Sequence, residues 1–362
     1  MLKEKFDSAF AFLQTKSPLI GVDISSSALK LVELSEMGKV AYRLERYAIE
    51  PLPKDVVADG NIANLDQVSE TLRRAHKRLG SRNRNIAMAL PTAMVITKKI
   101  IVPSGQTEEE LELQVEAEAN QYIPFALDEV NLDFQIHGAA PNNPDEFEVL
   151  IAASRKEKVD DRVAIADAAG LRPRVMDVES YATEEAFVMI SPSLPANGRD
   201  QNVALVDIGA HVMHFYVLRN NQILFSRDQA FGGNQLTHDI QRAFNLSPEE
   251  AESAKKNAGL PENYDADVLQ PFMETVALEV TRALQFFFTS TSYNQVDQVV
   301  LAGGCALLPG LDELVAKRAG VNTIVGNPFA SMTASDRIRP RQLAADAPLL
   351  LIACGLALRG FE

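Results

Sequence analysis

Two aspartates of this 362-residue chain each end an apolar segment and precede a turn of small residues. Residues 20–26 read IGVDISS and residues 204–210 read ALVDIGA, so the two halves of the chain open alike. Small residues let backbone N–H groups approach phosphate oxygens, and an aspartate at a strand end can hold Mg²⁺ through water. Either turn alone is more simply a capped β-turn. Together they predict a polyphosphate site with Mg²⁺, made by Asp23, Ser25, Ser26, Ser27, Asp207, Gly209 and Ala210.

Two further groups of residues suit a nucleoside. Gly303, Gly304 and Cys305 follow an apolar segment that reads as a strand, and paired glycines permit close approach of the backbone to a base or a phosphate. Glu252 and Lys255 are three residues apart on one face of a predicted helix. This pair is either a surface ion pair of little energetic value or a clamp for ribose and adenine.

Composition limits the kinds of partner. The formal net charge is −14, which disfavours nonspecific binding to nucleic acid or to anionic lipid, so no nucleic-acid partner is expected. Hydrophobic residues make up 46% and charged residues 23%, which is ordinary for a globular protein. The two cysteines form no CxxC motif, which is typical of a reducing compartment. The longest apolar run, residues 347–358, contains Pro348 and is too short to span a membrane, and no signal peptide is recognisable.

Periodicity predicts an α/β fold of two lobes around a cleft. A stripe with helical spacing predicts a helix over residues 65–79, and Thr107 with Glu110 forms a capping box that opens a helix over 108–122. Alternating residues 130–136 predict a half-buried strand. Helices over 180–190 and 348–359 are expected to cross closely beneath the cleft as a hinge, because Ala182, Ala186, Ala353 and Gly355 are small. The expected organisation is an N-terminal helical segment (1–17), a first-lobe core (18–93 and 179–200), an inserted α+β partner-binding subdomain (94–178), a second-lobe core (201–232 and 295–362) and a helical subdomain of the second lobe (233–294).

The order of these motifs resembles the actin-like ATPase superfamily, which includes FtsA. Within it, the chain resembles the PilM family of type IV pilus assembly proteins over nearly its whole length from residue 18. The similarity is carried by GVDISSS (21–27), KLVEL (30–34), NQYIPF (120–125) and ACGLALR (353–359). The ensemble is far more specific than any single motif.

The resemblance implies ATP and Mg²⁺ as cofactors. Asp23 and Asp207 would hold Mg²⁺ through water, Lys30 and the two turns would meet the phosphates, and Gly232 and Gly233 would approach the nucleotide from the second lobe. Glu252 and Lys255 would hold the ribose side, and Gly303, Gly304 and Cys305 would lie against the adenosine.

The chain departs from the superfamily pattern in ways that predict slow or negligible hydrolysis. The first turn lacks the glycine that often follows the aspartate, and the second has no Thr or Ser soon after its small pair. His211 and His214, expected on opposite faces of one strand, are interpreted as structural or hydrogen-bonding residues rather than metal ligands. No obvious water-activating carboxylate emerges from the sequence.

The resemblance also implies partners. The inserted subdomain would bind the cytoplasmic tail of the membrane protein PilN, with residues 122–125 and 130–136 either as groove walls or, taken singly, as core. Motor ATPases and the platform protein would be further partners, and the protein would be cytoplasmic, held at the inner membrane through its partners. An FtsA-like division protein and a small-molecule kinase of the same superfamily remain alternatives.

Overall fold

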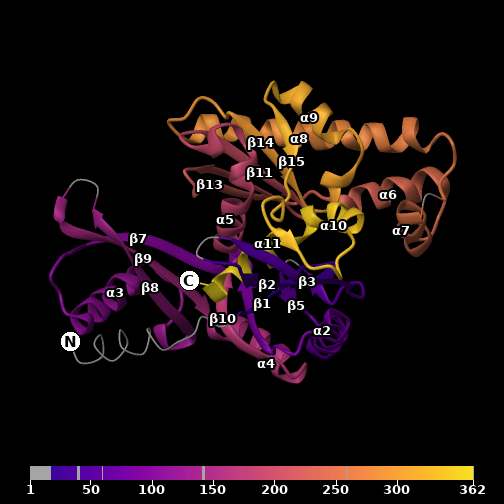
Figure 1. Ribbon diagram of the computed structural model, residues 1–362. Coiled ribbons are helices and arrows are strands. Elements are labelled where there is room, and N and C mark those ends of the chain that lie inside the picture. The colour runs from indigo at the N-terminus through magenta and orange to yellow at the C-terminus, as the bar shows by residue number, and fades with distance from the viewer. Residues whose placement is uncertain (1–17, 39–40, 59, 141–142, 258, 362) are drawn as a thin grey trace.

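The computed structural model describes residues 18–38, 41–58, 60–140, 143–257 and 259–361. They form two α/β lobes, one on a six-stranded sheet and one on a five-stranded sheet, and a three-stranded sheet extends sideways from the first lobe (Figure 1). This confirms the predicted two-lobed α/β fold. The helix predicted within residues 1–17 lies outside the described residues.

The first lobe is a sheet in the order β10-β6-β1-β2-β3-β16, with β1 antiparallel to β2 and parallel to β6. One face packs against α2 and α4, where the apolar stripe of α2 meets Ile20, Val22 and Ile24 of β1. The α2 helix ends at Gly80, whose φ of 68° suits glycine. The elements are β1 (Ile20–Ile24), β2 (Ala28–Glu36), β3 (Tyr42–Pro51), β4 (Val57–Ala58), β5 (Asn61–Ile62), α2 (Leu65–Leu79), β6 (Asn85–Leu90), α4 (Lys156–Ala168), β10 (Arg172–Val178) and β16 (Thr333–Ala334).

The second lobe is a sheet in the order β13-β12-β11-β14-β15, with helices on its outer face. The hairpin between β12 and β13 turns at Asn220 and Asn221, both at positive φ, as their sequence predicts. The elements are β11 (Asn202–Ile208), β12 (Met213–Arg219), β13 (Gln222–Gln229), α6 (Gly233–Phe244), α7 (Pro248–Asn257), α8 (Gln270–Ser290), β14 (Gln298–Ala302), α9 (Leu311–Ala319) and β15 (Thr323–Val325).

Helices α5 (Glu179–Ile190) and α11 (Leu351–Leu358) lie between the two sheets and contact each other. A Cβ atom on Gly355 would lie 1.7 Å from the carbonyl oxygen of Ala182, and one on Gly21 would lie 2.0 Å from that of Ala353. The predicted close crossing is therefore confirmed. Side chains of α5 pack with β11 in the same core cluster in which α11 packs with β2.

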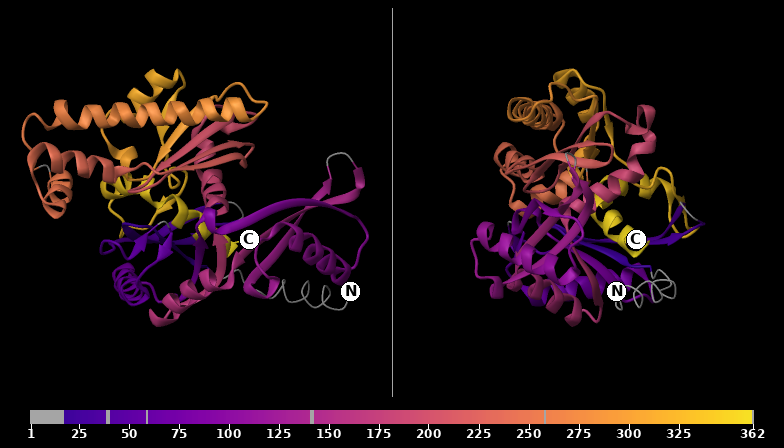
Figure 2. Two further views of the ribbon diagram at one scale, coloured as in Figure 1. Left: turned by 180° about the vertical axis from the view of Figure 1, so that it is seen from behind. Right: turned by 90° about the vertical axis from the view of Figure 1, so that its left-hand side faces the viewer.

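The lateral extension is the sheet β7-β9-β8 with α3 on one face (Figure 2). Its elements are β7 (Val95–Pro103), α3 (Glu108–Tyr122), β8 (Val130–Ala140) and β9 (Asn143–Arg155). The Thr107–Glu110 capping box is present as predicted, with both reciprocal hydrogen bonds.

Two predicted boundaries are wrong because long-range pairing overrides chain order. Strand β10 pairs with β6 and α4 packs on α2, so residues 156–178 belong to the first lobe and not to the insertion. Strand β16 pairs with β3, and α11 packs on β1, so part of the range 295–362 also completes the first lobe.

One helical stretch among the described residues, Pro340–Phe361, is long and apolar enough to cross a membrane by length and composition. It includes α10 (Pro340–Asp346) and α11, and so extends beyond the apolar run that the sequence marks as too short. Of its most apolar window, 61% is buried inside the protein. Because α11 packs between the lobes, this stretch is a core helix of the fold.

Candidate functional site

Asp23 is the last residue but one of β1 and faces Lys30 of β2 directly across the first hairpin. Its carboxylate is only 2% exposed, and Oδ2 accepts a hydrogen bond from Lys30 Nζ at 2.9 Å. The other oxygen, Oδ1, is buried and has no hydrogen-bond partner within the part of the chain that the structure describes. A buried carboxylate oxygen without a partner costs free energy, so this atom marks a place where a ligand would be stabilising.

Asp207 occupies the matching place in the second lobe, within a row of charged groups across three strands. Asp207 pairs in register with His214 of β12, and His214 pairs with Asp228 of β13. His214 Nδ1 lies 2.7 Å from Asp228 Oδ1. Burial lowers the pKa of His214, but the hydrogen bond and charge of Asp228 and the charges of Asp207 and Glu179 outweigh it and raise the pKa to about 9. His214 is therefore a cation at neutral pH.

The two aspartates act on one another and on the same ammonium group. Burial raises the pKa of Asp207, the charge of Asp23 raises it further, and His214 and Lys30 oppose the rise. Burial lowers the pKa of Lys30, but Asp23 and Asp207 outweigh burial and raise it. The ends of β1 and β11 are thus close enough for their charged side chains to act on one another.

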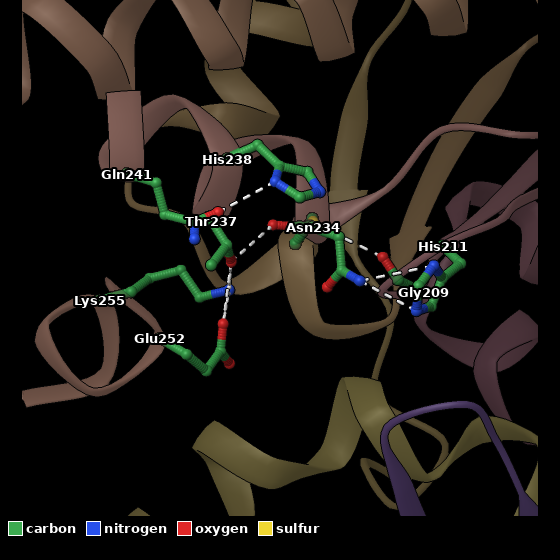
Figure 3. Close-up of polar contacts among 10 residues, drawn as sticks. Gly209, His211, Asn234, Thr237, His238, Gln241, Glu252 and Lys255 are labelled. Carbon is green, nitrogen blue, oxygen red and sulfur yellow. Dashed lines mark hydrogen bonds and ion pairs between the residues drawn. The ribbon is translucent and has the colours of Figure 1, made fainter. Parts of the chain in front are cut away.

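His211 was expected on the strand beside His214, and that expectation is wrong. His211 precedes β12, which begins at Met213, and lies in the turn. Its ring Nε2 lies 2.9 Å from Asn234 Nδ2 of α6 (Figure 3). The turn is short because the Gly209 N–H donates to the carbonyl of Val212 at 3.0 Å.

Ser25 closes the first turn. Its N–H and its hydroxyl both donate to the Ala28 carbonyl, at 3.1 and 2.8 Å. This supports the simpler alternative of a capped turn for that hydroxyl. Ser26 is half-buried and Ser27 is exposed, so their side chains remain the candidates on this turn for contact with a phosphate.

Gly232 and Gly303 allow their loops to pack closely against the turn that follows Asp207. A Cβ atom on Gly232 would lie 2.6 Å from the carbonyl oxygens of Gly209 and Ala210, and one on Gly303, which has a φ of 79°, would lie 2.3 Å from Asp207 Oδ1. These two glycines thus make room for the Asp207 turn, whereas the sequence pattern attributes them to nucleotide approach. The N–H of Gly233 donates to the carbonyl of Gly209 at 2.9 Å, which joins the start of α6 to the same turn.

Gly304 and Cys305 have different surroundings from Gly303. A Cβ atom on Gly304 would have no described atom within 4 Å apart from its neighbours in the chain, so this position adjoins open space. Burial raises the pKa of the Cys305 thiol to about 12, which keeps it neutral. Its Sγ lies 3.9 Å from the Gly209 carbonyl oxygen, so Cys305 packs under the turn.

Glu252 and Lys255 of α7 form an ion pair of 2.6 Å, and Thr237 of α6 joins it. Thr237 Oγ1 donates to Glu252 Oε2 at 2.9 Å and accepts from Lys255 Nζ at 2.8 Å (Figure 3). The pair is thereby fixed to α6, unlike a simple surface ion pair. Sequence reasoning missed Thr237, although it lies one helical turn after Gly233 and faces the same side.

Glu179 is a second residue that sequence reasoning missed, and its environment makes it a candidate for accepting a proton. It begins α5 directly after β10. Burial raises its pKa, Asp23 raises it further, and His214 and Arg162 oppose the rise, so that the pKa is about 7. A carboxyl group with a pKa near neutrality can accept a proton from water. The carboxyl ends of the parallel strands β10, β6 and β1 meet at one edge of the sheet. The position of Glu179 directly after one of these strands is the sequence signal that could have located it.

The residues present fit a metal-bound polyphosphate. Asp23 offers a free carboxylate oxygen, Asp207 is an adjacent carboxylate, and Lys30 and His214 supply positive charge. Carboxylates that reach the metal through water are typical of Mg²⁺, which retains several water ligands. Among the described residues, no cluster of three or more histidine, cysteine, aspartate or glutamate side chains could hold a metal by itself. The phosphates would therefore have to complete the ligand shell.

Comparison with known proteins identifies the family. The family model "Type IV pilus assembly protein PilM" matches residues 21–361. The chain is similar to a solved structure described as a PilM–PilN type IV pilus biogenesis complex, with 30% sequence identity, a TM-score of 0.78, and coverage of 96% of this chain and 99% of that one.

Curated proteins match more distantly. Ethanolamine utilization protein EutJ of Escherichia coli is 28% identical over 152 residues, which cover 41% of this chain and 51% of EutJ. Cell division protein FtsA of Streptococcus pneumoniae is 27% identical over 159 residues, which cover 37% of this chain and 34% of FtsA. The chain thus spans about half or less of these relatives. The two-lobed arrangement and the similarity to solved structures identify the fold as the actin-like ATPase fold.

Proposed function

This chain belongs to the PilM family of type IV pilus assembly proteins, and from that premise we propose that it is an ATP-binding scaffold of the pilus machinery. The observation that carries the nucleotide part is the pair of aspartates, one from each lobe, whose charges act on one another, together with the buried Asp23 Oδ1 that has no hydrogen-bond partner among the described residues. A polyphosphate that bridges both lobes would join them, so nucleotide state would alter their relative orientation.

Each group has a defined task in this proposal. Asp23 and Asp207 hold Mg²⁺ through water, and the metal neutralises the charge of the phosphates. Lys30 and His214 contribute positive charge from opposite hairpins, and the turns at Ser26, Ser27, Gly209 and Ala210 meet the phosphates. The Glu252–Lys255 pair, fixed by Thr237, faces the ribose, and Gly304 leaves room for the base.

Hydrolysis is slow in this proposal. Glu179 has the pKa of a general base and is close enough to Asp23 to sense its charge. The Asp207 turn, however, offers a hydroxyl at none of residues 208–213 to orient a water molecule. The chain would therefore act through its bound nucleotide more than through turnover.

The partner surface is the lateral extension. The solved relative is a complex with PilN, and we assign the cytoplasmic tail of PilN to the corresponding part of this chain. Tyr122, Phe125 and Ile136 are exposed on the extension, at 47%, 37% and 45%, and supply apolar anchors. Ile123 and Val130 are buried core residues and are not part of this surface. PilN would hold the protein at the cytoplasmic side of the inner membrane, where motor ATPases and the platform protein would be further partners.

Nucleotide binding is tested by titrating the purified protein with a fluorescent ATP analogue in Mg²⁺, after any retained nucleotide has been identified and removed. Asp207→Ala should weaken binding by about tenfold or more, since each lost charge-assisted contact is worth about 1.5–3 kcal/mol. Asp200→Ala removes an equally charged but exposed side chain outside the site and should leave binding unchanged. Normal affinity in folded Asp207→Ala would refute the site.

The partner assignment is tested separately with a synthetic PilN tail. Paired substitution Tyr122→Ser and Phe125→Ser should abolish its binding, whereas Leu224→Ser, an exposed apolar residue on β13, should not. Binding of an FtsA-type partner peptide, or phosphorylation of a small acceptor by ATP, would instead favour the division protein or the kinase.

A further inference from the structure

A cavity of about 520 Å³ lies away from the candidate nucleotide site, between β3, the end of α2 and the chain segment that precedes α11. Four arginines from three separate parts of the chain line it: Arg46, Arg78, Arg337 and Arg339. We call it the arginine cavity. None of the residues assigned to the phosphates, the metal or the nucleoside lines it.

The segment that carries Arg337 and Arg339 is held to β3 and to the core. The N–H of Ser335 donates to the carbonyl of Leu44 of β3 at 2.9 Å, and the N–H of Ile338 donates to the carbonyl of Ser335 at 2.9 Å. Ile338 packs against the central core cluster. With Ile338 anchored inward, the two flanking arginines remain exposed at the cavity. The guanidinium groups are thus presented by a braced segment.

Two of the four arginines have no carboxylate partner. Arg46 is 3.2 Å from Glu33 and Arg78 is 3.4 Å from Glu50, but Arg337 and Arg339 make no ion pair with any described residue. The two acidic lining residues are engaged elsewhere, because Glu45 accepts a hydrogen bond from Ser35 and Asp346 accepts one from Tyr47 at 2.8 Å. In a chain with a net charge of −14, two unpaired arginines in one hollow leave a local site for an anion.

We propose that the arginine cavity binds a phosphate ester through Arg337 and Arg339. The guanidinium fork matches phosphate oxygens in bidentate geometry and keeps its charge at every physiological pH. The volume lies within the range of small-molecule sites. A phosphorylated small molecule and a phospholipid headgroup share this chemistry. The site is separate from the nucleotide cleft and does not depend on the function proposed above.

The experiment uses the full chain in EDTA, where the aspartates of the nucleotide cleft have no metal to recruit phosphate. Calorimetric titration with inorganic pyrophosphate reports a free phosphate ligand, and flotation with vesicles of phosphatidylglycerol and phosphatidylcholine reports a headgroup. The double variant Arg337→Ala/Arg339→Ala should lose about tenfold or more in whichever interaction the wild type shows. The control Arg341→Ala removes the same charge from the same segment outside the cavity and should change it less than twofold.

Loss of binding in the double variant but not in Arg341→Ala supports the site. The assay in which the wild type binds, pyrophosphate titration or vesicle flotation, identifies the source of the phosphate. Wild-type-like binding by a folded double variant overturns the proposal, as does equal loss in Arg341→Ala, which would indicate bulk charge. A wild type that binds neither pyrophosphate nor the vesicles overturns it as well.

Discussion

Lys30 and His214 occupy the same place in the two lobes. Each lies on the second strand of its hairpin, in register with the aspartate next to the end of the first strand, so Asp23 faces Lys30 as Asp207 faces His214. The internal repeat visible in the sequence around the aspartates therefore extends to their cationic partners. The partners differ in kind, because the lysine keeps its charge at any physiological pH and the histidine keeps its own through Asp228.

The second lobe should consequently be the pH-sensitive one. With a folded pKa of about 9 against 6.5, the His214 contribution to stability is fully present below pH 6.5 and is lost as pH rises through 9. Asp228→Asn should remove roughly 2 kcal/mol at pH 6 and much less at pH 10. Urea unfolding between pH 6 and pH 10 measures the loss of unfolding free energy, and NMR titration of the His214 ring gives its pKa directly. Asp239→Asn, which removes a half-buried carboxylate of α6 that is paired with Arg242 and not with a histidine, is the control. An equal loss at both pH values would contradict the assignment.

Glu179→Gln should separate binding from turnover. The amide keeps the shape of the carboxyl group but cannot accept a proton, so ATP affinity should persist while hydrolysis falls by about a hundredfold. In the wild type, the ionised form accumulates above the pKa of about 7, and single-turnover hydrolysis of labelled ATP should rise with pH through that value. Glu184→Gln, on the next turn of α5, serves as the comparison. Undiminished hydrolysis in Glu179→Gln would show that another group activates water.

Thr237→Val should weaken the binding of ATP without weakening the binding of inorganic tripolyphosphate. The substitution leaves Glu252 and Lys255 unfixed on the nucleoside side, while the phosphate turns are unaffected. The expected loss for ATP is about five- to tenfold, since a typical hydrogen bond contributes roughly 1 kcal/mol. Thr237→Ser retains the hydroxyl and should restore affinity. Parallel loss for ATP and tripolyphosphate would indicate a general disturbance of α6.

Gly355→Ala should disrupt the centre of the molecule. Its methyl group would lie 1.7 Å from the Ala182 carbonyl oxygen, so α5 and α11 would have to separate, at a cost of about 3 kcal/mol or more. Denaturant unfolding measures the loss. Gly304→Ala, whose methyl group meets no protein atom within 4 Å, should be close to neutral. A stable Gly355→Ala variant would show that this crossing can relax.

Local sequence signals located the elements well because their causes are local. The apolar spacing of α2, its glycine stop and the Thr107–Glu110 capping box all depend on residues within a few turns. The two Asp turns were likewise evident, since strand, aspartate and small residues are adjacent in sequence. Which atoms a glycine makes room for was not evident, because the neighbours of Gly303 come from another loop.

Non-local pairing limited the rest. Strand β10 follows the extension in sequence and returns to β6, and β16, two residues long, adds to β3. Neither pairing can be predicted from the local pattern of apolar and polar residues. Glu179 and Thr237 are single polar residues in otherwise ordinary helices, and only the meeting of strand ends or of two helices gives them a role.

The exchange of helices between the lobes bears on how the chain is made. The sheet of the first lobe receives α11 only after the strands of both lobes have been synthesised, while α5, made earlier, packs with strands synthesised after it. Neither lobe has its full apolar covering until α11 has been made. Ribosome-bound nascent chains that stop before α11 should therefore remain sensitive to protease in both lobes, and the two lobes should mature together once α11 has emerged.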